Sequence, residues 1–140
     1  MIHELVSLNC LAVIVVALIA FFLGGLWYSP LLFVKPWMAE MKMTSEQMKA
    51  KSGGMVKTFA SAFLLTLVST ATLATLIQDH HSVTVLSGAK LGLFVGIGLV
   101  AAREGTNAIF EQRTMRHFLI VAGYDVVLCG LQGAILGVWR

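Results

Sequence analysis

The sequence predicts an all-α integral membrane protein, a four-helix bundle with a short interfacial helix between its first and second spans. Of the 140 residues, 58% are hydrophobic and 12% are charged, which is more apolar than a soluble domain of this length can bury. The apolar residues form continuous runs of about 20 residues, the length that crosses a hydrocarbon core as a helix. Continuous runs favour helices over the alternating strands of an outer-membrane barrel.

Four runs define the predicted spans, at about residues 5–28, 56–77, 83–104 and 116–139. We expect the whole chain, residues 1–140, to form a single transmembrane domain. The basic residues lie in two of the loops: Lys35, Lys42, Lys49, Lys51 and Lys57 in the first, and Arg103, Arg113 and Arg116 in the third. The positive-inside rule therefore predicts that loops 29–55 and 105–115 are cytoplasmic and that both termini lie outside.

The net charge of +3 belongs to these loops. We expect it to meet the anionic headgroups of a lipid bilayer, because no basic surface interleaved with aromatic residues is present to bind nucleic acid. Cys10 and Cys129 fall inside predicted spans at different depths, which favours two buried thiols over a disulfide.

The first loop contains a predicted interfacial helix. Thr44 and Gln47 have the spacing of a capping box. Trp37, Met38, Met41 and Met48 can share one apolar side, while lysines point to headgroups. The alternative is a solvated loop with scattered methionines. In either case Trp27, Tyr28 and Trp37 are predicted anchors at the inner interface, with Trp139 at the outer one.

Small residues in the third and fourth spans predict close helix packing. Gly88, Gly92 and Gly96 recur every four positions, as do Cys129, Gly133 and Gly137. Such faces let helix backbones approach, within one subunit or between subunits. In the second span, hydroxyls such as those of Thr66, Thr70 and Thr75 are expected to bond to carbonyls one turn earlier, in preference to lining a polar pore.

Asp125 is the most unusual residue of the spans, since it lies about 12 Å from one end of its predicted helix. A carboxylate at that depth needs a partner, a proton or water. Lys90 is the candidate partner, and Gln132 lies on the same helical stripe as Asp125. The competing interpretation is that Lys90 extends outward to water and Asp125 is protonated. Asn9, in the outer third of the first span, is expected to form a hydrogen bond between helices.

A second polar group follows the third span, at the predicted cytoplasmic mouth of the bundle. It comprises Arg103, Glu104, Asn107 and Glu111. Arg103, Asn107 and Glu111 recur every four positions and form one helical stripe. This stripe is either a solvated helix end or a site facing the inner mouth. The adjacent His80 and His81 point to different sides, so we expect no metal site and no cofactor.

Several motifs together resemble the bacterial family known as domain of unknown function 1761. They are Asn9 with Ala12, the segment 24–30 (GGLWYSP), Phe33, the segment 35–38 (KPWM), Asn107 with Phe110 and Glu111, and the segments 118–120, 122–124 and 133–137. Val34 stands where that family usually has glycine. The resemblance implies a four-span membrane protein, with no reaction or substrate.

A second, weaker similarity is to the membrane-associated eicosanoid and glutathione metabolism family. It rests on the four spans and on Arg103, Asn107 and Glu111, although Asn107 and Glu111 are spaced one residue wider than in that family. This similarity implies a trimeric enzyme that binds glutathione between subunits.

Three hypotheses for function follow from these observations. The first is a homo-oligomeric bundle of the bacterial inner membrane that binds or passes a small solute, ion or lipid-like molecule, with Asp125 and Lys90 as a gating pair. The second is an accessory subunit whose glycine faces dock a larger membrane partner. The third is a glutathione-dependent membrane enzyme. The sequence favours a protein that is not an enzyme.

Overall fold

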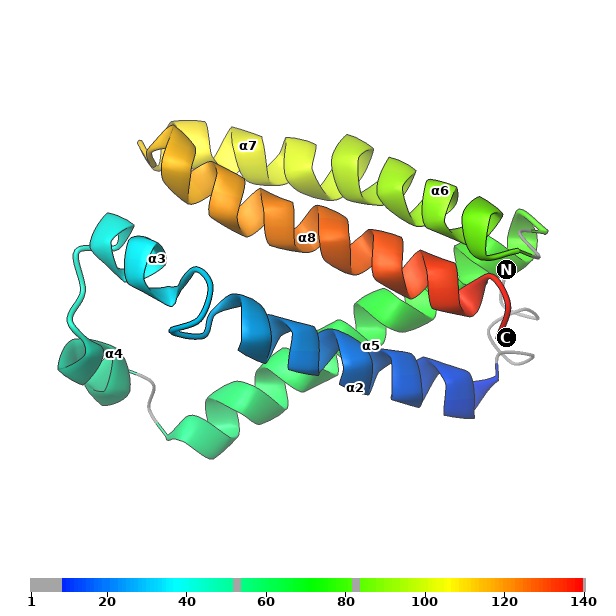
Figure 1. Cartoon of the computed structure of the whole chain (residues 1–140), viewed down its shortest axis with the longest axis horizontal. Coiled ribbons are helices and arrows are strands. Elements are labelled where there is room, and N and C mark those ends of the chain that lie inside the picture. Colours follow the sequence, from blue (N-terminus) through cyan, green and yellow to red (C-terminus); the bar gives the residue numbers. More distant parts are fainter. Residues whose placement is uncertain (1–8, 52–53, 82–83, 140) are drawn as a thin grey trace.

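The computed structural model describes residues 9–51, 54–81 and 84–139, and every regular element within them is a helix (Figure 1). Four of the described helical stretches are long and apolar enough to cross a membrane: Cys10–Trp27, Val56–Asp79, Val85–Phe110 and Met115–Leu136. The predicted fold class, an all-α membrane bundle of four spanning helices, is therefore confirmed.

The first spanning helix is α2 (Cys10–Trp27), and Asn9 caps it. The Asn9 side chain accepts a hydrogen bond from the backbone N–H of Ala12 at 3.1 Å. It satisfies one of the amides that a helix start leaves without a partner. Among the described residues the structure records this cap for Asn9, and no hydrogen bond from Asn9 to another helix. The predicted start of this span, residues 5–8, lies outside the described residues.

Two short helices, α3 (Val34–Glu40) and α4 (Ser45–Lys51), replace the single interfacial helix that the sequence predicts. The break falls at Lys42, whose φ of 51° is left-handed and cannot continue a helix. The capping box is confirmed at the start of α4. Thr44 N–H donates to Gln47 Oε1 at 3.0 Å, and Gln47 N–H donates to Thr44 Oγ1 at 3.2 Å.

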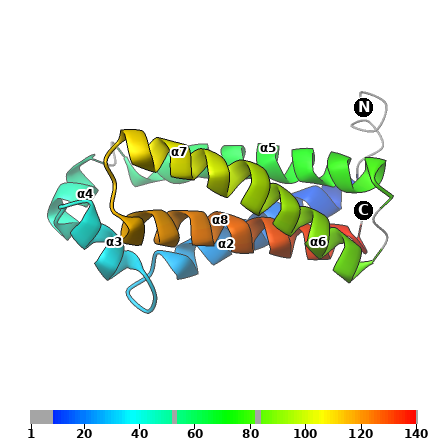
Figure 2. The same cartoon turned by 90° about the horizontal axis from the view of Figure 1, so that it is seen from above.

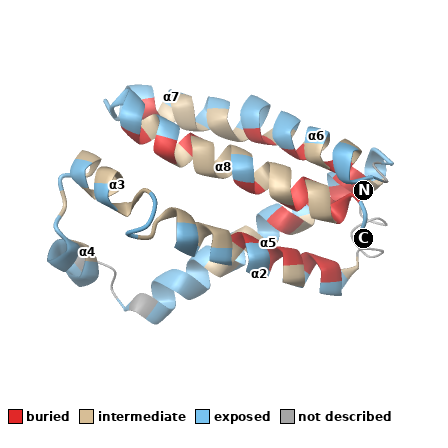
Figure 3. Cartoon of the chain, in the orientation of Figure 1, coloured by how far each residue is buried: buried red, intermediate tan, exposed pale blue. Residues whose placement is uncertain are grey.

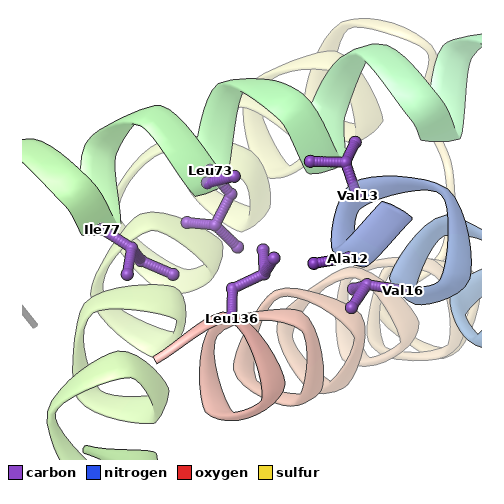
Figure 4. Packing of buried hydrophobic residues seen from close by; sticks show 7 residues of the cluster. Ala12, Val13, Val16, Leu73, Ile77 and Leu136 are labelled. Atoms are coloured by element: carbon purple, nitrogen blue, oxygen red, sulfur yellow. The ribbon is translucent and has the colours of Figure 1, made fainter. Parts of the chain in front are cut away.

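The second spanning helix is α5 (Met55–Asp79), which follows Gly54 at a φ of 111° that favours glycine. Its second half packs against α2 and the end of α8 (Met115–Leu136) around a small apolar core (Figure 4). The core comprises Ala12, Val13, Val16, Leu73, Ala74, Ile77 and Leu136. Towards α3 and α4, by contrast, α2 and α5 diverge (Figure 1). Exposed residues predominate in the first half of α5 (Figure 3).

The third span is a continuous rod of α6 (Val85–Val95), the π-helical turn η1 (Gly96–Ala101) and α7 (Ala102–Phe110), which runs beside α8 (Figures 1 and 2). The sequence predicts a span that ends near residue 104 and a helix that continues beyond it, and the helix continues to Phe110. The polar residues after Ala102 do not interrupt its backbone hydrogen bonds.

Glycines bring this rod into backbone contact with α8. A methyl group added to Gly88 would meet the carbonyl oxygen of Gly133, and one added to Gly92 would meet that of Cys129. Further along the rod, a methyl group on Gly105 would lie 3.3 Å from the ring of Phe118. The glycine faces of the two spans therefore pack against each other within one chain.

Candidate functional site

A cavity of about 580 Å³ lies where α2 and α5 diverge (Figure 1). These two helices form its walls, with Phe21, Gly24 and Gly25 from α2 and Thr58, Phe59, Ala62 and Thr66 from α5. Phe21 bridges the walls, because its ring makes edge contacts with Phe59 at 6.0 Å and Phe63 at 5.8 Å between centroids. An added methyl group on Gly25 would meet nothing within 4 Å. The small residues of α2 thus leave this space open.

The cavity is closed at one end by the short helices and by α8. Val34 and Trp37 come from α3, Met48 and Lys49 from α4, and Tyr124 from α8. Among the described lining residues, Lys49 is the one with a charged side chain. The lining is otherwise apolar or aromatic, with a few hydroxyls, which is typical of sites for small hydrophobic ligands.

Tyr28 and Tyr124 form an aromatic pair in the wall of the cavity, with ring centroids 5.5 Å apart. Trp37 contacts Tyr28 at 5.7 Å, which links α3 to this pair. Tyr28 lies just beyond the last residue of the first candidate span. Burial, followed by the charge of Asp125, raises the pKa of the Tyr28 phenol to about 12. Its hydroxyl is therefore a proton-bearing hydrogen-bond donor at neutral pH.

Trp27 contacts α8 on the inside of the bundle. Its indole N–H donates a 3.1 Å hydrogen bond to the carbonyl oxygen of Ile120, and its ring lies 4.7 Å from that of Phe33. A second hollow of about 240 Å³ lies beside it, with Arg116 in its lining. Trp27 thus joins α2 to α8, a role that an interface anchor does not require. Trp139 is 38% exposed at the far end of the chain.

Asp125 does not pair with Lys90, which overturns the predicted gating pair. Lys90 is exposed, and Asp125 is half-buried beside Gly96, whose added methyl group would lie 3.6 Å from the Asp125 carbonyl oxygen. Lys90 lies about 200° around the helix from Gly88 and Gly92, at about 100° per residue, so it points away from α8. Within the described residues Asp125 forms no ion pair. It lies within electrostatic range of Glu104 and Tyr28 instead.

Gln132 forms the main polar contact between spans. Its Nε2 donates a 2.6 Å hydrogen bond to Thr70 Oγ1 on α5. Thr70 in turn donates to the carbonyl oxygen of Thr66 at 2.8 Å. Thr66, Ser69, Thr72 and Thr75 also donate to carbonyls three or four residues earlier. The predicted local bonding of these hydroxyls is therefore confirmed.

The residues of the predicted cytoplasmic mouth do not converge. Arg103 is exposed, and Glu104 and Asn107 are half-buried on α7. Glu111 follows the end of that helix and pairs with Arg113 at 3.1 Å. Arg113 also donates to the sulfur of Met41 at 3.2 Å, and Thr114 bonds to Glu40. This end of the bundle is thus held together by contacts between α3 and the turn before α8.

No cavity was predicted from the sequence, although five of the lining residues belong to segments that carry the family resemblance: Gly24, Gly25, Tyr28, Trp37 and Tyr124. Phe21, Thr58 and Phe59 read as ordinary span residues, and Lys49 reads as one loop lysine among several. The adjacent Gly24 and Gly25 are the signal in these segments that points to open space. Two glycines near the end of a span remove side-chain volume where helices would otherwise touch.

Comparison with known proteins gives a family and no activity. The family model described as protein of unknown function (DUF1761) matches residues 11–137. No curated protein and no solved structure matches the chain.

Proposed function

The chain belongs to the DUF1761 family of proteins of unknown function, and we propose that it binds a small lipid-like molecule in the cavity between α2, α3, α4 and α5. The observation that carries this proposal is the cavity itself. Its volume of about 580 Å³ falls within the roughly 300–1,000 Å³ of ligand sites, and its walls are apolar and aromatic.

The position of the cavity supports a ligand that comes from the bilayer. It lies between two spanning helices and extends towards α4, a short helix outside the spans. Along α5 it reaches from Thr58 to Thr66, which is about 12 Å of helix. A molecule in this space contacts apolar side chains along its length and reaches polar groups at one end. Lipid-like molecules have that distribution of polarity.

We further propose that the end carrying α3, α4 and the turn before α8 faces the cytoplasm of a bacterial inner membrane. Lysines and arginines gather in the segments at this end, including Lys35, Lys42, Lys49, Arg113 and Arg116, as the positive-inside rule requires of a cytoplasmic side. A homo-oligomer, a larger membrane partner and passage of the ligand across the bilayer stay predictions from the sequence.

Fluorescence quenching tests the proposed binding. The assay uses a Trp139→Phe variant in nanodiscs of zwitterionic lipid. The variant is titrated with ω-bromoundecanol, whose bromine quenches the fluorescence of a nearby tryptophan. Trp37 lines the cavity, so we expect saturable quenching that Trp37→Phe removes.

Two glycine variants provide the matched comparison. Gly25→Leu places a side chain in the open cavity and should abolish saturation. Gly98→Leu also meets open space, but on the outer face of the rod, and should leave saturation intact. Quenching that rises without saturation, equally in all variants, would reject the cavity as a binding site.

A further inference from the structure

We propose that the ligand of this cavity carries a carbonyl group, as a ketone or an ester does, and that the hydroxyl of Tyr124 donates a hydrogen bond to its oxygen. This inference rests on the proposed function and specifies the chemistry of the ligand's polar group.

The cavity wall carries hydrogen-bond donors that have no partner in the protein. Within the described part of the chain, the structure records no hydrogen bond from the hydroxyls of Tyr28 and Tyr124 or from the indole N–H of Trp37, and all three residues line the cavity. An indole N–H can only donate, and a phenol carries its proton at neutral pH. A molecule in this space therefore meets donors that can pair with an acceptor of its own.

The same wall offers few acceptors in return. The described lining side chains include no carboxylate, amide or imidazole, and the Thr66 hydroxyl already donates to the carbonyl oxygen of Ala62 at 2.9 Å. A ligand hydroxyl or amide would bring a donor into this apolar space, where an unpaired polar hydrogen is costly. A carboxylate would accept, but burying its charge costs more than burying a neutral group. A carbonyl oxygen accepts without either cost.

The Tyr124 hydroxyl is held at the cavity wall. The Tyr124 ring packs against those of Tyr28 and Trp27, with centroids 5.5 Å and 6.1 Å apart. Its hydroxyl oxygen reaches from α8 to Gly24 on α2, where an added methyl group would lie 2.9 Å from it. Gly24 itself lines the cavity. The missing side chain at this position therefore leaves room for the hydroxyl beside the ligand.

The apolar part of the ligand is expected to extend from Gly24 towards Phe21. Phe21 lies deeper in the span, about 4.5 Å further along the axis of α2. Its ring contacts Phe59 and Phe63 on the opposite wall. A carbonyl group beside Tyr124 thus leaves the hydrocarbon chain among aromatic rings.

Two brominated probes test this inference in the quenching assay. Methyl ω-bromoundecanoate has an ester carbonyl, and bromododecane has a chain of similar length without a hydrogen-bonding group. Both are titrated against the Trp139→Phe variant with and without Tyr124→Phe, which keeps the ring and removes only the hydroxyl. We expect Tyr124→Phe to weaken ester binding about fivefold, as for the loss of one neutral hydrogen bond. Binding of bromododecane should not change, which also shows that the variant is folded.

Thr66→Val is the matched control. It removes another hydroxyl from the cavity lining, but one whose proton is already donated within α5, so ester affinity should stay the same. Infrared spectroscopy gives a direct second measurement. The carbonyl stretching band of a bound, isotope-labelled ester should move to higher frequency when Tyr124→Phe removes the donor.

The outcomes separate this inference from the proposed function. The carbonyl ligand is overturned if both probes quench saturably and Tyr124→Phe leaves ester affinity unchanged, or weakens both probes equally. An equal loss of ester affinity in Thr66→Val overturns it too. In each of these cases the cavity stays a lipid site. Absence of saturable quenching by both probes overturns both proposals.

Discussion

Gln132 and Thr70 form a buried hydrogen bond between α8 and α5, with 2% and 0% of the two residues exposed. The Thr70 hydroxyl accepts from the Gln132 amide and donates to the Thr66 carbonyl. In a membrane, where apolar contact gives no preference for a neighbouring helix over lipid, such a bond helps to fix which faces of two spans meet.

Replacing Thr70 with Ala should lower the free energy of unfolding by about 1 kcal/mol, because the Gln132 amide loses its acceptor inside the bundle. Thr72→Ala is the matched control. The Thr72 hydroxyl bonds only within its own helix and its residue is exposed, so the change should stay within about 0.5 kcal/mol. Unfolding in mixed detergent micelles measures both values. Equal losses of unfolding free energy in the two variants would show that the hydrogen bond between the helices contributes nothing to stability.

Gly92→Ala should destabilise the protein by about 1–3 kcal/mol. The added methyl group meets the carbonyl oxygen of Cys129, and both groups belong to helix backbones that must move apart to make room. Gly98→Ala adds the same methyl group where nothing lies within 4 Å. It should be neutral or stabilising by up to about 1 kcal/mol, because alanine favours helices. A thermal melt of both variants decides the matter, and a Gly92→Ala protein as stable as Gly98→Ala would contradict the close contact of α6 and α8.

Asp125→Asn should leave the thermal stability unchanged or raise it. Asp125 forms no ion pair among the described residues, and its nearby charge, Glu104, has the same sign. If Asp125 instead formed a buried ion pair with Lys90, removing the carboxylate would cost about 3–5 kcal/mol.

A double-mutant cycle with Lys90→Gln distinguishes these cases. We expect no coupling between the two substitutions, since Lys90 points away from α8. A large loss of stability in each single variant, with no further loss in the double variant, would show that Asp125 and Lys90 form an ion pair.

The spans were predictable because lipid leaves a chain few alternatives to helices that satisfy their own backbone. The contact between α6 and α8 was also predictable, because glycines repeat at helical spacing in both spans, at Gly88, Gly92, Gly133 and Gly137. Pairing Lys90 with Asp125 failed for a different reason. The depth of a residue in the membrane follows from counting residues along its helix. The direction in which its side chain points depends on how the helix is rotated about its axis. Packing of the glycine face against α8 determines that rotation.

The cavity was not predictable from the residues that line it. It exists because α2 and α5 pack together in the cluster that contains Val13 and Leu73 and diverge towards α3 and α4. The paths of two helices are a property of the whole bundle. Phe21 and Lys49, 28 positions apart in the sequence, share one space only after that divergence.

The π-helical turn at Gly96–Ala101 changes the rotational position, around the helix axis, of the residues that follow it in α7. A π turn adds one residue to the helical repeat. Counting on by fours from Gly96 in an unbroken α-helix would bring the carboxylate of Glu104 against α8. The extra residue delivers Gly105 to that place instead, where its missing side chain admits the ring of Phe118. One extra position in the helical repeat thus leaves Gly105, and not Glu104, beside Phe118, while Glu104 lies within electrostatic range of Asp125 and Tyr28.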